Sequence, residues 1–260
     1  MPLALVERLA ARGIETPVLS ADGLLASADP HGRAAPWRDL HAGDVVVART
    51  RHRLALALLR AATRPGVAVL TPWRAIARVR NKARAAQLLA EHRIPTPVTL
   101  LCDAPGTLAR LPRERFPLLL KPHLGDNAQG LVLVRDPEEL GGLDWEDGIV
   151  LAQEYVDAGA VDLKLYAAGD RIWAVRRRSP LAAGPVEDPG VRVEPAAEHV
   201  ELVRACRDAF GLDLMGVDVL ETSDGPLVVD VNEFPNYTGV EEAPDVIAEL
   251  VAAALEGATA

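Results

Sequence analysis

Residues 216–237 read GVDVLETSDGPLVVDVNEFPNY, and the rest of the chain can be interpreted around this stretch. Two apolar runs, residues 216–220 and 227–231, enclose the polar residues 222–226. Short apolar runs on either side of a turn that contains serine, aspartate and glycine are the pattern of a β-hairpin. The stretch therefore predicts two paired strands.

Three polar residues interrupt the predicted hairpin: Asp218, Asp230 and Asn232. Asp230 and Asn232 are two residues apart, so their side chains leave a strand on the same face, and Asp218 on the partner strand can point to that face too. Converging oxygen ligands suit Mg²⁺, which completes its shell with water and substrate phosphate. The alternative, that these residues merely flank turns, is disfavoured because Asp230 lies inside an apolar run, where an unpaired charge is costly to bury.

The composition is that of a soluble globular protein. Of the 260 residues, 49% are apolar and 25% charged, enough for one large or two modest domains with a substantial core. The net charge of −9 argues against a general nucleic-acid binder. Cys102 and Cys206 form no CxxC pair, so neither a disulfide framework nor a zinc site is indicated. We expect a cytoplasmic enzyme without a membrane partner, because neither a leader pattern nor a long apolar run is visible.

Residues 1–80 predict a small α/β lobe. Residues 44–49 and 66–70 read as short strands, and residues 53–63 between them as an amphipathic helix. Strand, helix and strand in this order indicate a parallel, right-handed crossover. The lobe has no glycine-rich loop, so we interpret it as a scaffold or as a substrate-side lobe. Weaker signals, interpreted as strand remnants, lie at residues 18–19 and 24–25.

Residues 73–91 predict one helix that is basic in its first half and apolar in its second. Lys82 lies in the basic half, among arginines that could simply form a solvated face: Arg78, Arg80 and Arg84. The helix must end at residues 92–97, which contain two prolines, because the residue before a proline is pushed toward extended backbone.

Residues 116–121 predict a buried strand that ends in Lys121, followed by a loop of small residues and a second strand at residues 131–134. A lysine at a strand end beside such a loop is a phosphate-binding arrangement, since glycines let backbone N–H groups approach phosphate oxygens closely. Alone, this pattern is ambiguous, because an ordinary hairpin carries similar residues. It matches neither the P-loop nor GxGxxG.

Residues 149–155 predict another strand, and residues 161–167 and 172–175 predict a hairpin. Alternate residues of the first hairpin arm share one face and are polar: Asp162, Lys164 and Tyr166. Three arginines extend the second arm: Arg176, Arg177 and Arg178. If this face lines a cleft, it can hold anions; if it faces solvent, the same alternation is only a half-buried antiparallel sheet.

In this order, the motifs resemble the ATP-grasp superfamily, most closely its RimK-like branch, over roughly residues 75–250. They are Lys82 ahead of the proline-rich link, FPLLLKP with its loop, QEYV, DLKLY, and GVDVL with VVDVN. The resemblance implies an α/β protein with an ATP-grasp fold, in which two α+β subdomains hold ATP between them. We accordingly expect an N-terminal lobe, a first subdomain and a second subdomain at residues 1–80, 81–160 and 161–260.

The resemblance also implies which residues bind ATP and metal. Lys82 and Lys121 correspond to two lysines that hold the phosphates of ATP, and Asp162 and Lys164 to ribose-side and phosphate-side positions. The phosphate loop would use Gly125, Asp126, Asn127 and Gly130, and the adenine linker Gln153, Glu154, Tyr155 and Val156. Two Mg²⁺ ions, which Mn²⁺ could replace, would be bound by Asp218, Asp230 and Asn232. The candidate catalytic residues are Lys164, Arg176, Arg177 and Arg178.

The implied activity is that of a carboxylate–amine ligase. In such ligases ATP phosphorylates a small carboxylate or a peptide carboxylate, and an amine attacks the acyl phosphate to give an amide. The arginines could stabilise the acyl phosphate and the tetrahedral intermediate. The sequence indicates neither the identity of the acceptor nor an oligomeric state.

Two segments depart from the ligase pattern. RimK-like ligases usually read N-x-S-P-G after the metal strand, whereas residues 232–237 read NEFPNY, and residues 179–199 lack the usual Arg-Ser-Asn and glycine pattern. Both departures lean toward the inositol-polyphosphate kinases of the same superfamily, which phosphorylate a hydroxyl. Those kinases resemble this chain in a strand pair that runs K-x-x-x-x-G from Lys164 and ends in Arg-x-Ser at residues 177–179, and in the ending D-x-N-x-F-P-x-Y at residues 230–237. Against a kinase stand the acidic net charge and a scarcity of basic clusters outside residues 49–53 and 78–84. A kinase is therefore the alternative to the ligase, and a non-catalytic nucleotide-binding module is a third possibility.

Overall fold

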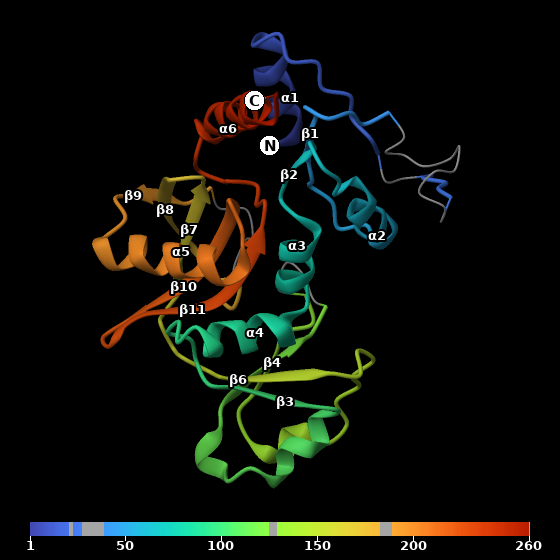
Figure 1. Ribbon diagram of the computed structural model, residues 1–260. Helices are drawn as coiled ribbons and strands as arrows, with labels where there is room; N and C mark the ends of the chain where they lie inside the picture. The colour runs from blue at the N-terminus through green and yellow to red at the C-terminus, as the bar shows by residue number, and fades with distance from the viewer. Residues whose placement is uncertain (21–22, 28–38, 125–128, 183–188, 260) are drawn as a thin grey trace.

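The computed structural model describes residues 1–20, 23–27, 39–124, 129–182 and 189–259. The strands within these ranges form three sheets, which Figure 1 shows one below the other, with the two-stranded sheet near the termini and the four-stranded sheet at the opposite end. The five-stranded sheet lies between them, in the order β11-β10-β7-β8-β9. Helices and sheets are thus mixed along the chain, as the α/β fold class predicted.

The N-terminal part of the chain contains the predicted strand–helix–strand unit. Its elements are α1 (Pro2–Ala11), β1 (Val45–Val47), α2 (Arg53–Ala62), β2 (Ala68–Leu70) and α3 (Trp73–Arg80). Parallel pairing of β1 with β2 is confirmed, with Val46 opposite Val69. The predicted strand remnants at residues 18–19 and 24–25 are wrong, because these residues are not in strands. Val18 and Leu25 are 75% and 84% exposed, so these short apolar pairs bury too little surface to order a strand.

The predicted helix at residues 73–91 is two helices, α3 and α4 (Lys82–Glu91). The break lies at Asn81, whose backbone is extended and whose side chain accepts a hydrogen bond from the Arg84 N–H at 3.0 Å. Asparagine is a strong N-cap because its side chain satisfies an N–H group that has no partner within the helix. Lys82 is therefore the first residue of α4, and its own N–H donates to the carbonyl of His123.

The four-stranded sheet is antiparallel and has the order β3-β6-β4-β5. The two strands predicted on either side of the small-residue loop are confirmed as β4 and β5, and they pair with each other. One face of the sheet packs into an apolar core with two short 3-10 helices, through residues such as Leu118, Leu120 and Val150. The strands are β3 (Thr99–Cys102), β4 (Leu118–Pro122), β5 (Val132–Val134) and β6 (Val150–Glu154).

The five-stranded sheet is also antiparallel, and both of its predicted hairpins are confirmed. One face packs against helix α5 (Ala197–Phe210), where Leu165, Val217 and Phe210 belong to the same core. Helix α5 ends at Gly211, whose φ of 73° is the left-handed conformation that glycine adopts at low cost. The strands are β7 (Val161–Ala168), β8 (Arg171–Arg178), β9 (Val191–Val193), β10 (Leu214–Thr222) and β11 (Gly225–Glu233).

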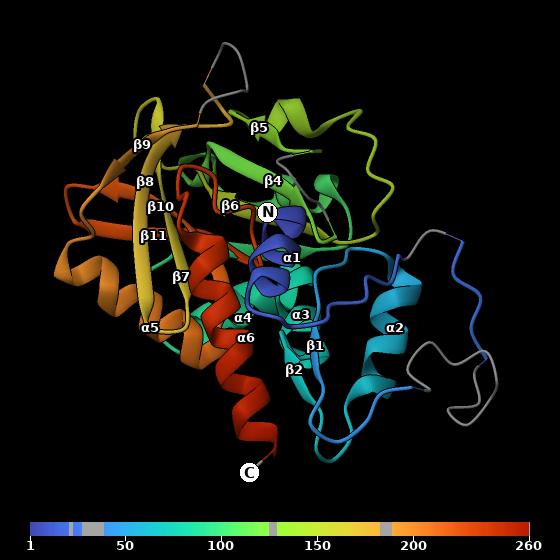
Figure 2. The same cartoon turned by 90° about the horizontal axis from the view of Figure 1, so that it is seen from above.

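The opposite face of this sheet is divided. Its aromatic part, which includes Tyr166 and Trp173, packs with the C-terminal helix α6 (Ala243–Thr259) and with α1. In Figure 2, α1 and α6 lie side by side, between this sheet and the β1–β2 pair. The remaining part of the face is charged and lines a cleft toward the four-stranded sheet. Within the described ranges, no helix has the length and apolar character needed to cross a membrane.

Candidate active site

A cleft of about 460 Å³ lies between the four-stranded and the five-stranded sheets. Residues from α4, β4 and β6 line one side, and residues from β7, β10 and β11 line the other. The connection between the two sheets contributes Tyr155, Val156, Ala158, Gly159 and Ala160. The volume is in the range of small-molecule sites in proteins.

Three charged residues form a row across the strands of the five-stranded sheet. Lys164 on β7 is the register partner of Asp218 on β10, which in turn pairs with Asp230 on β11. Lys164 Nζ lies 2.8 Å from Asp218 Oδ2, and Lys82 Nζ reaches from α4 to Asp230 Oδ1. We call Lys164, Asp218 and Asp230 the charged row. Each of its two carboxylates is thus neutralised by a lysine, Asp218 by Lys164 and Asp230 by Lys82.

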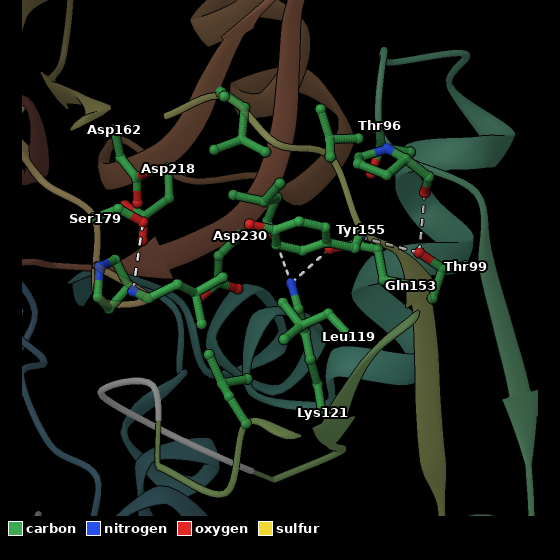
Figure 3. A pocket seen from close by; sticks show the side chains of 18 of the residues that line it. Thr96, Thr99, Leu119, Lys121, Gln153, Tyr155, Asp162, Ser179, Asp218 and Asp230 are labelled. Carbon is green, nitrogen blue, oxygen red and sulfur yellow. Dashed lines mark hydrogen bonds between the residues drawn. The ribbon is translucent and has the colours of Figure 1, made fainter. Parts of the chain in front are cut away.

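Lys121 joins the two sheets at this point. The register between β10 and β11 shifts after Asp218, so Val229 is an extra residue in β11, which is a β-bulge. The Val229 carbonyl accepts a hydrogen bond from Lys121 Nζ at 3.2 Å, and Gln153 Oε1 accepts another at 2.6 Å. Figure 3 shows Lys121 pointing into the cleft toward Asp230. Burial lowers the pKa of Lys121, and the charge of Asp230 partly opposes this effect.

Asp162 lies two residues before Lys164 on the same face of β7. It is 5% exposed, and burial raises the pKa of its carboxyl, while Lys164 and a hydrogen bond from Ser179 act in the opposite direction. Burial tends to lower the pKa of Lys164, but the net shift is upward because Asp218, Asp162 and Asp230 stabilise its charged form. In Figure 3, Asp162, Ser179 and Asp218 gather at one side of the cleft. Lysines and carboxylates therefore alternate along this wall.

The other side of the cleft is less charged. Glu154 turns its side chain to Arg115, with 2.9 Å between the charged atoms, and its N–H donates to the Val98 carbonyl. A ligand in the cleft would therefore meet the Glu154 backbone rather than its carboxylate. Apolar residues from both sheets and from their connection form an apolar wall of the cleft that can accept a flat aromatic ring: Leu119, Leu151, Val156, Leu220 and Val231.

Most of the site residues expected from sequence lie around this cleft. Those that line it are Lys82, Lys121, Gln153, Glu154, Tyr155, Val156, Asp162, Lys164, Arg178, Asp218 and Asp230. Gly125, Asp126 and Asn127 lie outside the described residues. Gly130 has a φ of 73° and packs next to Pro122 beside the cleft. Asn232 lies two residues after Asp230 on β11, opposite Gly216, and does not line the cleft.

The three candidate arginines have different positions. Arg178 lines the cleft, whereas Arg177 bonds to the Tyr166 hydroxyl just beyond it. Arg176 points to the opposite face of the sheet, where its guanidinium pairs with Glu221 at 3.0 Å. This placement favours Arg178 and Arg177 over Arg176 for contact with a substrate.

Sequence reasoning missed two contributors to the cleft. Ser179, 7% exposed, bonds to Asp162, and it entered the sequence interpretation only as the end of the kinase-like Arg-x-Ser motif, with no role in the site. The Val229 carbonyl contacts Lys121 because of the bulge, and a bulge leaves no clear signal in an alternating apolar pattern.

The donor set can be tested against a metal ion. The described residues contain no cluster of three or more His, Cys, Asp or Glu side chains that could hold one. Asp218 and Asp230 are nevertheless direct cross-strand neighbours, with side chains 25% and 30% exposed, and Asn232 follows on the same face. Two carboxylates and an amide oxygen fit Mg²⁺, which needs few protein ligands because water and phosphate complete its shell.

Comparison with known proteins agrees with this geometry. Residues 79–254 match the family model of the RimK-like ATP-grasp domain. A probable alpha-L-glutamate ligase of Stutzerimonas stutzeri is 32% identical over 206 residues, which are 72% of this chain and 66% of that protein. A tetrahydromethanopterin:alpha-L-glutamate ligase of Methanococcus maripaludis is 30% identical over 193 residues, 69% of this chain and 66% of that protein.

Solved structures support the same fold. A RimK domain ATP-grasp protein of Sphaerobacter thermophilus superimposes with a TM-score of 0.70 and 25% identity, covering 98% of this chain and 95% of that one. The D-cycloserine synthetase DcsG superimposes with a TM-score of 0.72 and 21% identity, covering 98% and 94%. The expected ATP-grasp fold is thus confirmed. The chain spans slightly less than two thirds of the length of the two glutamate ligases. On its sequence and its fold, this chain belongs to the RimK-like ATP-grasp family.

Proposed function

We propose that this protein is a carboxylate–amine ligase that uses ATP and Mg²⁺ and acts on a small carboxylate or a peptide. The observation that carries the proposal is the charged row, which faces Lys121 and Lys82 across a cleft between two sheets. The glutamate-ligase names of the relatives favour a ligase over a kinase. So do structural neighbours such as the ATP-grasp ligase PsnB, solved with a minimal precursor, Mg and ADP.

The cleft residues have separable roles in this proposal. Lys121 and Lys82 bind the phosphates of ATP. Lys121 is positioned by its hydrogen bond to the Val229 carbonyl, and Lys82 by its ion pair with Asp230. The apolar wall receives the adenine, next to the backbone of Glu154 and Val156. Asp218, Asp230 and Asn232 would hold Mg²⁺, which when bound neutralises charge on the transferred phosphoryl group.

The proposed reaction has two steps. A carboxylate oxygen of the acceptor bonds to the γ-phosphorus of ATP while the bond to the β–γ bridging oxygen breaks, which gives an acyl phosphate and ADP. The amine nitrogen of the second substrate then attacks the acyl carbon, loses a proton, and displaces inorganic phosphate to leave an amide. Lys164 and Arg178, which both line the cleft, would stabilise the negative charge on the acyl phosphate.

The structure also accounts for the segment that resembled a kinase. Phe234 and Tyr237 are 3% and 2% exposed and belong to the aromatic core beside α6. Tyr237 Oη donates to the Ala167 carbonyl at 2.7 Å. The two aromatic residues of the NEFPNY segment therefore have a packing role, which weakens the argument that they indicate a kinase.

The test is a product assay on a panel of carboxylates and amines. We expect ADP and inorganic phosphate in equal amounts together with an amide, and we expect hydroxylamine to trap the acyl phosphate as a hydroxamate. Formation of ADP without inorganic phosphate, with an acceptor that gains the mass of a phosphoryl group, would show a kinase instead. Inositol phosphates belong in the panel for this reason.

We also propose that the site binds two metal ions rather than one, and that Mn²⁺ can replace Mg²⁺. A cytoplasmic location, the lack of a nucleic-acid partner, and the division of the chain at residues 80 and 160 also stay predictions. Titration of activity with each metal, with the bound metal counted by mass spectrometry under native conditions, tests the first two.

A further inference from the structure

All the lysines of this chain line the cleft. The chain has 28 lysines and arginines, of which only three are lysines: Lys82, Lys121 and Lys164. The planar fork of an arginine would hold a carboxylate by two parallel hydrogen bonds, whereas a lysine carries a point charge on a flexible stem. A lysine–carboxylate pair is therefore easier to exchange, and this chain reserves lysine for the cleft.

Two of these lysines pair with the carboxylates proposed to bind metal. Lys82 pairs with Asp230, and Lys164 Nζ lies 2.8 Å from Asp218 Oδ2. The lysine side chains are 17% and 14% exposed, so both pairs are partly shielded from water and interact more strongly than surface ion pairs. A divalent ion on either carboxylate would lie next to an ammonium group, and the two like charges would repel each other.

The position of Lys82 allows its side chain to change partner. Its backbone is fixed at the first residue of α4, where its N–H donates to the His123 carbonyl at 2.9 Å. The dipole of a helix disfavours a positive charge at this end and favours an anion. Asp230 supplies that anion in the structure, and a phosphate group of ATP could supply it equally well.

The charges around the cleft are balanced. The described residues that line it carry four positive and four negative side chains: Lys82, Lys121, Lys164 and Arg178, and Glu154, Asp162, Asp218 and Asp230. A metal ion that enters alone would disturb this balance, whereas ATP and its metal ions largely cancel each other's charge. The balance therefore favours joint binding of metal and nucleotide.

We propose that Lys82 and Lys164 compete with the metal ion for the carboxylates of Asp230 and Asp218. The protein then binds the metal weakly until the phosphates of ATP draw these ammonium groups away from the carboxylates. Lys82 has the larger part, because it alternates between Asp230 and a phosphate. This inference rests on the proposed function, since it takes Asp218 and Asp230 as metal ligands and Lys82 as a phosphate contact.

Metal binding tests the inference without any need for turnover. The probe is Mn²⁺, titrated into the protein without nucleotide and followed by the electron paramagnetic resonance signal of the free ion. Lys82→Met frees the Asp230 carboxylate from its ammonium partner. We therefore expect this variant to bind Mn²⁺ at least about tenfold more tightly than the wild type, the size of one charge-assisted contact.

Lys121→Met is the matched control, because it makes the same substitution and the same change in net charge in the same cleft. Lys121 Nζ donates to neutral acceptors, Gln153 Oε1 and the Val229 carbonyl, so this variant frees no carboxylate. Its affinity for Mn²⁺ should rise by less than about threefold, through the loss of a neighbouring positive charge alone.

Calorimetric titration with a non-hydrolysable ATP analogue gives the reciprocal measurement. The gain in analogue affinity on addition of Mg²⁺ should be smaller in Lys82→Met than in the wild type, because the coupling between two ligands is the same from either side. Thermal melting verifies that each variant is folded. Should Lys82→Met fail this check, Lys164→Met takes its place, since it frees Asp218 in the same way.

Equal affinity of the wild type and Lys82→Met for Mn²⁺ would overturn the inference. Equal increases in Lys82→Met and Lys121→Met would overturn it too, because they would reflect charge alone. Failure of the proposed function looks different. A wild type whose affinity for the ATP analogue does not respond to Mg²⁺ would remove the proposed metal ligands and the inference together, whereas a product assay without an amide would contradict the ligase alone.

Discussion

The five-stranded sheet has two faces that differ in chemistry although they alternate along the same strands. Toward α5, Leu165 and Val217 are fully buried in an apolar core. Toward the cleft, their chain neighbours Lys164 and Asp218 form an ion pair. Because successive side chains of a strand point to opposite faces, adjacent residues here serve stability and chemistry separately. Substitutions one residue apart should therefore have effects of different kinds.

The largest effect is expected at the charged row. Asp230→Ala removes a proposed metal ligand and leaves Lys82 without its carboxylate partner, so turnover should fall by roughly a thousandfold. Melting temperature should change little, because Asp230 is 30% exposed and its ion pair contributes modestly to stability. Steady-state ADP release and thermal melting measure the two quantities.

Asp224→Ala is the control for this variant, because Asp224 lies at the turn of the same hairpin and is exposed. It makes the same change in net charge and should retain wild-type turnover. An Asp230→Ala protein with near-normal turnover at saturating Mg²⁺ would exclude Asp230 as a metal ligand.

A substitution on the face that packs against α5 should lower stability and leave ATP binding nearly unchanged. Leu165→Ala leaves a cavity under α5 and should reduce the free energy of unfolding by about 2–5 kcal/mol. The affinity of the remaining folded protein for an ATP analogue should stay within about threefold of wild type, because Leu165 points away from the cleft. Urea unfolding and calorimetric titration measure these quantities. A loss of ATP affinity without a loss of stability would contradict the separation of the two faces.

A smaller effect is expected for the lysines that cross the cleft. Lys121→Met should weaken binding of a non-hydrolysable ATP analogue by about 1.5–3 kcal/mol, or one to two decades. Lys82→Met should weaken it less, because Lys82 already pairs with Asp230, whereas Lys121 has only neutral acceptors among the described residues, Gln153 and the Val229 carbonyl. Calorimetric titration of both variants gives the comparison. Wild-type affinity in Lys121→Met would refute its assignment to phosphate.

The charged face could be predicted from the sequence because side chains at every second position of a strand share one face of its sheet. The alternation placed Asp162, Lys164 and Tyr166 on one face, as the structure confirms. The sequence did not specify that Asp218 lies directly opposite Asp230. That pairing depends on the bulge at Val229, and register with a bulge is a property of the two strands together.

Other features depended on tertiary contacts that have no local signal. Asn81 fits an uninterrupted helical pattern, and its capping role is visible only in the hydrogen bond to the Arg84 N–H. The buried positions of Phe234 and Tyr237 likewise depend on helix α6, which approaches from the end of the chain. Their segment was interpreted as a kinase motif because the amino-acid sequence alone does not show whether an aromatic residue packs in a core or contacts a substrate.

The smallest expected effect tests the aromatic part of the cleft-side face. Tyr237→Phe removes the hydroxyl that donates to the Ala167 carbonyl at 2.7 Å, while the ring keeps its contact with Tyr166, 5.5 Å between centroids. The carbonyl loses a buried partner, so the free energy of unfolding should fall by about 1–2 kcal/mol. Turnover should stay within about twofold, since Tyr237 does not line the cleft. Urea unfolding and ADP release, measured on the same preparation, check both expectations. A large loss of turnover with unchanged stability would show that the aromatic part acts on substrate, and the division of this face into a chemical and a packing region would be wrong.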